Sequence, residues 1–384
     1  MSKPARALAA RNGSLRLRAS RSAGVEQAEV MPDQLSPRHV RRRLLQLAGV
    51  AVVISTLVLA VPGLGEVRTR LAHASLGWLA LAVGLEVGSV LCYVLLFRAV
   101  FCPRMHWRFS FQIATSELAA NSVLPTSGAG GLALGAWALR RGGMNVEQIS
   151  RKTVSFFFLT SLANVSILIT FASLYAAGAL GRDPNPALID VFGALAVAAV
   201  LAVLALPAVL RRLPQSASAG GDPGRIARAL RLVRRSLMDG VPDAVLLLRR
   251  RSPGILTGSF GTTVCDLAVL AAAFRAIDVS PPVGVLVLGY LIGMLGGNVP
   301  VPGGIGGVDA GLIGALSLFH EPLAASTVAV LTYHAISLWV PAMLGGVAFT
   351  RLRATLLRQE RPAAICMPLA EPIEATPAPV PEHR

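Results

Sequence analysis

Charged residues are scarce in this chain, and their scarcity argues against an ordinary soluble domain. They form 15% of the 384 residues, whereas 54% are hydrophobic. Soluble domains have about 25% charged and roughly 45–50% apolar residues. The first 43 residues are polar and basic and lack an early apolar segment with a small-residue cleavage site, so we expect no secretory signal peptide.

Cysteines are also few, and their spacing argues against metal chemistry. The four are Cys92, Cys102, Cys265 and Cys366, with no CxxC pair or metal-ligand spacing among them. We interpret them as small buried hydrophobes or spectators. No nucleophile triad or phosphate loop is present either, so the sequence predicts no metal, no cofactor and no enzymatic activity.

The apolar residues occur in long blocks, which predict an all-α polytopic membrane protein. A block of 18 or more apolar residues with few charges is long enough to cross a bilayer as a helix. Residues 1–37 precede these blocks and are expected to be a disordered basic tail. The six predicted full spans are 44–62, 76–97, 153–177, 190–210, 254–276 and 323–349.

Two further apolar regions are interrupted by clusters of glycine and proline. The region 107–139 is broken between Leu124 and Gly131, and the region 283–319 between Gly296 and Gly307. Proline removes helical hydrogen bonds, and glycine permits close approach. Non-helical backbone at membrane depth survives only inside protein or along a wet cavity. We therefore expect two re-entrant broken-helix hairpins.

The net charge of +16 points to the membrane surface rather than to nucleic acid, because no nucleic-acid-binding motif accompanies it. With the N-terminus placed in the cytoplasm, all but four of the 36 Lys and Arg residues fall on the cytoplasmic side. The exceptions are Arg68, Arg70, Arg182 and Arg275. We expect a multi-pass plasma-membrane protein with both termini cytoplasmic and with anionic lipids at the basic loop 211–252.

The predicted topology makes the two halves inverted copies. The membrane domain is expected over 38–355, with units at about 76–177 and 254–349 joined through 178–253; residues 356–384 form a Pro-rich tail. Asn121 and Asn298 are each followed four residues later by proline and then by a Gly-Gly pair. Glu86 and Asp266 precede these asparagines by 35 and 32 residues.

Paired broken segments in two halves are typical of a transporter's central binding site. Half-helix N-termini there suit phosphate or carboxylate groups. The alternative is that the glycines and prolines only allow tight helix packing. The candidate substrate-binding and translocation residues are Glu117, Asn121, Pro125, Gly128, Gly130, Gly131, Asn298, Pro302, Gly303, Gly304, Gly306, Gly307, Asp309 and His334, with Glu86 and Asp266 as intramembrane carboxylates.

Carboxylates inside membrane segments are costly and usually mark pathways or proton relays. Glu86, Glu117, Asp266 and Asp309 outnumber the basic residues at similar depth. Either some are protonated, or the site accepts a cationic group. Structural hydrogen bonding between helices is the alternative role for each. For His334 we consider two roles, the handling of a proton and a buried structural position with its hydrogen bonds satisfied.

The polar loop contains a basic amphipathic stretch, residues 223–237. Apolar residues such as Leu230 and Val233 share one face, with arginines such as Arg231 and Arg235 largely opposite. We expect a helix that lies on the cytoplasmic leaflet. A solvated linker helix between the halves is the alternative.

Three segments together resemble the flippase-like membrane domain of lysylphosphatidylglycerol synthases and their stand-alone relatives. They are Glu117-Leu-Ala-Ala-Asn121 with Pro125 and the Gly128–Gly131 cluster, Pro302-Gly-Gly-Ile-Gly-Gly-Val-Asp309, and Tyr333-His-Ala-Ile-Ser-Leu-Trp-Val-Pro341 with Gly345. The resemblance covers about 40–355. The chain departs from the family pattern at Asp309, where the family usually has Glu, and at His334, where it usually has Arg.

The resemblance implies a transporter that moves an amphipathic lipid between leaflets, such as an aminoacylated phospholipid or a lipid-linked sugar. The family's synthases carry a large soluble catalytic domain, and only about 30 residues follow the last span here. The alternatives are a membrane partner or enzyme in aminoacyl-lipid or lipid-linked sugar metabolism, and a non-transporting scaffold. Homo-oligomerisation stays open.

Overall fold

The computed structural model describes residues 65–123, 129–179, 186–212, 225–250, 252–294 and 307–358. Throughout these ranges the chain forms helices joined by short turns and contains no strand. The predicted first span, 44–62, and the predicted N-terminal tail lie outside the described residues. The last described helix runs to Arg358 and so includes the first three residues of the predicted C-terminal tail, which starts at 356; the rest of that tail lies outside the described residues. The all-helical fold class is confirmed.

Eleven helices occur in the described part of the chain. They are α3 (Gly65–Ala72), α4 (Leu76–Phe101), α5 (Trp107–Val123), α6 (Ala129–Arg141), α7 (Val146–Ala176), α8 (Pro186–Arg212), α9 (Arg225–Arg249), α10 (Pro253–Ala276), α11 (Val283–Gly293), α12 (Gly307–Leu318) and α13 (Leu323–Arg358).

Five of these helices are long and apolar enough to cross a membrane, namely α4, α7, α8, α10 and α13. They correspond to the five predicted spans after the first. The helices run longer than the apolar blocks, because polar first and last turns continue beyond the hydrophobic stretch; α7, for example, begins at Val146 rather than at 153. Asn145 caps that start by accepting a hydrogen bond from the Gln148 amide at 2.7 Å.

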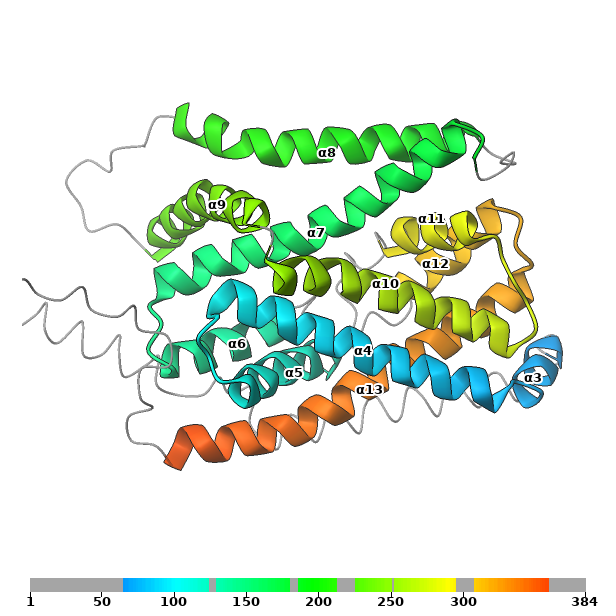
Figure 1. Cartoon of the computed structure of the whole chain (residues 1–384), viewed down its shortest axis with the longest axis horizontal. Helices are drawn as coiled ribbons and strands as arrows, with labels where there is room; N and C mark the ends of the chain where they lie inside the picture. Colours follow the sequence, from blue (N-terminus) through cyan, green and yellow to red (C-terminus); the bar gives the residue numbers. More distant parts are fainter. Residues whose placement is uncertain are drawn as a thin grey trace, which may run out of the picture.

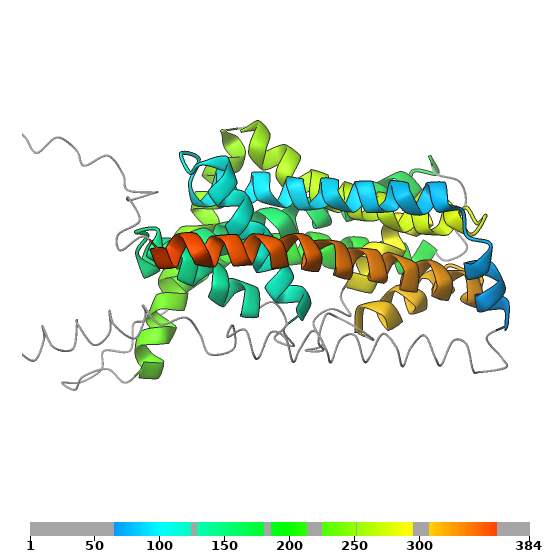
Figure 2. The same cartoon turned by 90° about the horizontal axis from the view of Figure 1, so that it is seen from below.

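Each interrupted region forms a pair of short helices, α5 with α6 and α11 with α12. A single helix needs about 20 residues to cross a bilayer, and α5 has 17, α6 13, α11 11 and α12 12. The first pair lies at the left end of the bundle and the second at the right end (Figures 1 and 2). The hairpins therefore enter from opposite ends, as expected for inverted units.

The helix contacts follow the same inversion. Exchanging α4 with α10, α5 with α11, α6 with α12 and α7 with α13 maps every principal contact among these eight helices onto another observed contact. The contact of α13 with α5, for example, has its counterpart in that of α7 with α11. The α4–α10 pair, which maps onto itself, is the most extensive of all. This pairing is the one that an inverted repeat produces.

Glycines allow α4 and α10 to lie close together at the centre of the bundle. A Cβ at Gly258 would come within 2.7 Å of the Leu96 backbone nitrogen, and one at Gly261 within 2.6 Å of the Cys92 sulfur. Small residues of this kind let membrane helices approach closely. Cys92 and Cys265 are free and meet across this interface, whereas Cys102 takes part in a disulfide, which corrects the expectation for that residue.

Two hydrophobic clusters hold the bundle, one around each hairpin. The first buries Phe97 and Ile113 among residues of α4, α5, α6, α7 and α9. The second buries Leu270, Leu288 and Leu316 from α10, α11 and α12. The middle of α4, α10 and α13 lies between the two clusters, and it is there that the polar side chains gather.

The helix ends at the left of Figure 1 carry most of the described basic residues. Arg98, Arg140, Arg211 and Arg249 lie in the last turns of α4, α6, α8 and α9. Helix α9 crosses the spans steeply at this end (Figures 1 and 2). The predicted amphipathic helix is confirmed, and it extends to Arg249 rather than ending at 237.

Candidate functional site

A polar cavity of about 280 Å³ lies where the two halves meet. Its walls come from α4, α5, α10 and α13, and its volume is close to the lower limit of about 300 Å³ for small-molecule pockets. The cavity therefore has the size of a lipid headgroup rather than of a whole lipid. The lining residues are Glu86, Ser89, Val90, Tyr93, Leu118, Asn121, Ser122, Thr262, Asp266, Tyr333, Ser337 and Pro341.

Two carboxylates, Glu86 of α4 and Asp266 of α10, face this cavity. Asp266 accepts a hydrogen bond from the Ser89 hydroxyl at 2.6 Å and one from the Tyr290 hydroxyl at 3.2 Å. Glu86 is only 4% exposed, and its Oε2 atom has no hydrogen-bond partner among the described residues. A buried oxygen without a partner is costly, so this atom is the one in the cavity most available to a ligand or a proton.

Tyrosines surround the carboxylates and connect the cavity to the second hairpin. Tyr290 of α11 and Tyr333 of α13 meet edge to face, with ring centroids 6.1 Å apart. The Tyr290 hydroxyl donates a hydrogen bond to Asp266. This bond links the Asp266 carboxylate of the cavity directly to α11. Tyr333 itself lines the cavity.

Asn121 closes the first hairpin and also lines the cavity. Its side-chain oxygen accepts a hydrogen bond from the Gly131 amide at 2.9 Å, across the break between α5 and α6. A Cβ at Gly131 would lie 2.2 Å from that oxygen and 2.5 Å from the Glu117 carbonyl oxygen. Only glycine fits there, so the predicted pairing of asparagine with glycine has a direct structural reason.

Glu117 is buried beside the cavity rather than on its wall. Its carboxylate packs against α6, where a Cβ at Gly135 would lie 2.8 Å from its Oε2 atom. The Tyr93 hydroxyl, which belongs to a cavity-lining residue, lies within hydrogen-bonding reach of Glu117. Glu117 thus contacts the cavity through Tyr93.

Asp309 and His334 form a separate pair on the second hairpin's side. The Nδ1 atom of His334 lies 2.8 Å from Oδ1 of Asp309, with both side chains about nine-tenths buried. Asp309 lies in the first turn of α12, where the helix dipole favours a negative charge. Neither residue lines the cavity, although His334 follows the cavity-lining Tyr333 directly in α13.

The cavity therefore brings together Glu86, Asp266 and Asn121 among the predicted residues. Glu117 is adjacent, Gly130 and Gly131 lie in the first turn of α6, and Gly307 begins α12. The remaining predicted residues lie outside the described part of the chain; they are Pro125, Gly128, Asn298, Pro302, Gly303, Gly304 and Gly306.

The sequence prediction did not include several polar residues of the cavity wall. Ser89 and Tyr93 follow Glu86 by three and seven residues, and Thr262 precedes Asp266 by four. Residues at these spacings share one face of a helix. Polar residues in helical register with an intramembrane carboxylate were thus the signal that could have identified them.

The cavity is acidic and rich in hydroxyl groups. Of the described residues that line it, none is Lys, Arg or His. Hydroxyl, amide and carboxylate groups together bind a polar headgroup, and the carboxylates favour one with a positively charged amine.

The fold and the site define a multi-pass helical membrane protein with a polar cavity between two inverted hairpin units. A comparison with family models gives a match over residues 46–345 to the lysylphosphatidylglycerol synthase TM region. The chain belongs to this family, and its membrane domain is thereby tied to lipid metabolism or transport. No curated protein matches the chain.

Proposed function

We propose that this protein is a lipid transporter that moves an amphipathic lipid between the two leaflets of its membrane. The observation that carries the proposal is the polar cavity at mid-bundle, which holds two carboxylates between apolar clusters. Buried polar surface in a membrane protein is expensive and is usually retained for a substrate path. Membership of a lipid-linked family supports lipid as the substrate.

In this proposal the headgroup passes through the cavity while the acyl chains stay in the bilayer. The 280 Å³ volume accommodates a headgroup but not two acyl chains. The free Oε2 atom of Glu86 is the first contact for a cationic group or a coupling proton. Asp266 acts with it, held in place by the Ser89 and Tyr290 hydroxyls.

The hairpins give the proposed path two ends. One hairpin lies at the left end of the bundle and the other at the right end (Figure 1). Alternating access in inverted-repeat transporters comes from movement of one repeat against the other around a central site. The α4–α10 pair, packed through glycine contacts, is the fixed axis around which the hairpins would move.

The proposal is tested by leaflet exchange in liposomes containing the purified protein. The substrates are labelled phospholipids with a lysyl, a neutral and an anionic headgroup, and the variant is Glu86→Gln/Asp266→Asn. The matched control is Glu147→Gln/Asp278→Asn, which makes the same chemical changes at exposed residues. Asn tolerates the positive φ of 57° at position 278.

We expect wild-type protein and the control to accelerate exchange of at least one of these lipids. The cavity variant should exchange lipid at least about tenfold more slowly, because a factor of ten corresponds to the loss of one modest polar contact. Wild-type protein that exchanges none of the three lipids above protein-free liposomes would contradict the proposal.

A further inference from the structure

A second hollow lies away from the cavity, between α8 and α9. This α8–α9 groove has a volume of about 440 Å³, well within the range of small-ligand pockets. Its walls are apolar, with Leu204 and Ala208 from α8 and with Val245 and Leu246 from α9. Two arginines, Arg211 and Arg249, also line it, together with Pro207, Val241 and Pro242.

Each arginine lies in the last turn of its own helix. Leu204, Ala208 and Arg211 are four and three residues apart, so they share one face of α8. Val245 and Arg249 are four apart on α9. Both arginines are exposed and occupy the last turn of their helices. The groove thus combines apolar walls with two cationic side chains.

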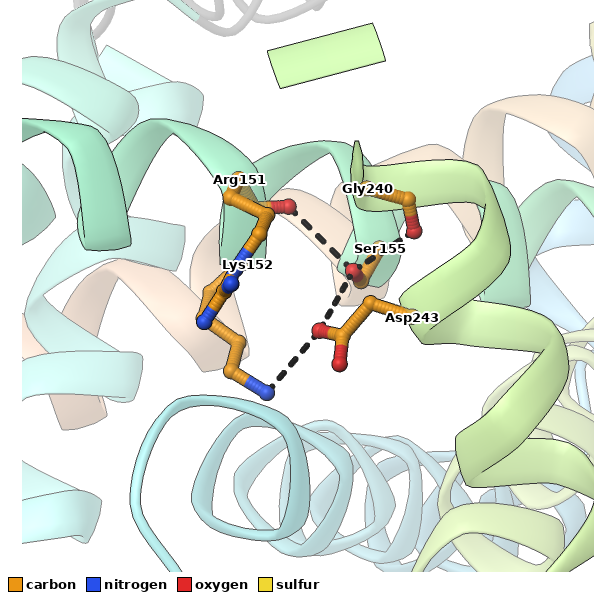
Figure 3. Close-up of polar contacts among 5 residues, drawn as sticks. All are labelled: Arg151, Lys152, Ser155, Gly240 and Asp243. Atoms are coloured by element: carbon orange, nitrogen blue, oxygen red, sulfur yellow. Dashed lines mark hydrogen bonds and ion pairs between the residues drawn. The ribbon is translucent and has the colours of Figure 1, made fainter. Parts of the chain in front are cut away.

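Helix α9 is fixed in its position against α7. The Ser155 hydroxyl of α7 lies 2.9 Å from the Gly240 carbonyl oxygen and 3.2 Å from Oδ2 of Asp243 (Figure 3). The Lys152 ammonium lies 2.9 Å from the same Oδ2 atom (Figure 3). A Cβ at Gly240 would lie 2.7 Å from Val154, so glycine is needed for this close approach.

Helix α9 is also fastened to α8. The Arg234 guanidinium donates a hydrogen bond to the Leu210 carbonyl oxygen in the last turn of α8. A cationic side chain at a helix C-terminus is favourable, because it binds the carbonyl groups that the helix itself leaves without donors. With contacts to α7 on one side and α8 on the other, the groove is held open by its own scaffold. A binding site of this kind is preformed, which lowers the cost of binding.

We propose that the α8–α9 groove binds an anionic phospholipid from the leaflet at the basic end of the bundle. The acyl chain lies along the apolar walls, and Arg211 and Arg249 bind the phosphate. No acidic side chain is among the described lining residues. Helix α8 exposes large apolar side chains such as Leu195 and Leu201, so this side of the bundle faces lipid.

This site is distinct from the proposed transport path, because it shares no lining residue with the cavity. Arginine forms two parallel hydrogen bonds with phosphate, and basic pockets beside membrane helices bind anionic headgroups. A bound anionic lipid would fasten α9, which lies between the two inverted units in sequence, to the membrane surface.

The test uses the full chain in nanodiscs of equal phosphatidylglycerol and phosphatidylcholine, followed by native mass spectrometry of gently extracted protein. The variant is Arg211→Gln/Arg249→Gln. Its matched control is Arg212→Gln/Arg250→Gln, which removes the same charge from the adjacent positions outside the groove. We expect the wild type and control to retain phosphatidylglycerol preferentially, and the variant to bind it about thirtyfold more weakly.

A second pair of variants tests the apolar walls with both arginines intact. Ala208→Trp fills the groove, whereas Val209→Trp adds the same ring at an exposed neighbour outside it. Loss of phosphatidylglycerol from Ala208→Trp alone supports the site. Equal loss from Arg212→Gln/Arg250→Gln, or full retention by both groove variants, overturns the proposal in favour of a general basic surface or another occupant.

Discussion

The two hairpins occupy equivalent places in the inverted repeat but carry different polar chemistry. In the first, the carboxylate is Glu117, before the break, and Asn121 ties the break closed. In the second, the carboxylate is Asp309, after the break, and it pairs with His334 of α13. The shared architecture therefore gives the proposed path two chemically different ends.

The hairpins also differ in how tightly a long neighbouring helix packs on them, α13 on the first hairpin and α7 on the second. Helix α13 packs on α5 at Gly345, where a Cβ would lie 2.0 Å from the Thr115 carbonyl oxygen. In the corresponding contact of α7 with α11, a Cβ at Gly284 would meet the end of the Tyr175 side chain, 2.3 Å from its hydroxyl. Backbone cannot move aside as a side-chain end can, so the first hairpin is held more rigidly.

The largest expected effect comes from Gly345→Ala. The added methyl group must displace the α5 backbone, which should cost about 3 kcal/mol or more of the free energy of unfolding. Gly284→Ala should cost less, because Tyr175 can rotate. The apparent Tm in detergent measures both, and Gly346→Ala is the control, since nothing lies within 4 Å of its Cβ position. Equal Tm losses at 345 and 284 would remove the proposed difference in rigidity.

A smaller effect is expected at the break of the first hairpin. Asn121→Ala leaves the Gly131 amide without its acceptor, which should cost about 1–3 kcal/mol. Asn121→Asp keeps an acceptor oxygen and should retain most of the stability. Unchanged Tm in Asn121→Ala would show that water or another group satisfies this amide and that the hairpin does not depend on the hydrogen bond.

On the second hairpin, we expect Asp309→Asn to impair translocation while the protein still inserts. Asparagine keeps an oxygen beside His334 but removes the charge, so a role in charge or proton handling is lost and the local packing is kept. Exchange in liposomes should fall by about tenfold with little change in Tm. A wild-type leaflet distribution would exclude Asp309 from that role.

Much of the fold was predictable, because the length of an apolar block indicates a membrane-spanning helix and a glycine–proline cluster indicates a break in one. The five later spans and both hairpins follow from these patterns. The wall of the cavity was harder to predict. Glu117 and Asp309 lie beside the breaks in sequence, yet Glu86 and Asp266 line the cavity because α4 and α10 pack against each other at the centre of the bundle.

The packing of α4 against α10 depends on residues far apart in the chain. Gly258 approaches Leu96, and Ser89 donates to Asp266, across 162 and 177 residues. Periodicity within one helix shows which residues share a face but not which helix that face meets. The pairing of Asp309 with His334 was likewise not apparent from the sequence, in which each of these residues only departs by itself from the residue usual in the family.

The two cavity carboxylates differ in how their oxygens are hydrogen-bonded. Asp266 has two hydroxyl donors, whereas Glu86 has an oxygen without a partner. We therefore predict that Glu86→Gln alone slows lipid exchange in liposomes by at least about tenfold, the factor that corresponds to 1.4 kcal/mol, at unchanged Tm. Exchange at the wild-type rate in Glu86→Gln would contradict the account of the cavity as the place where the headgroup is handled.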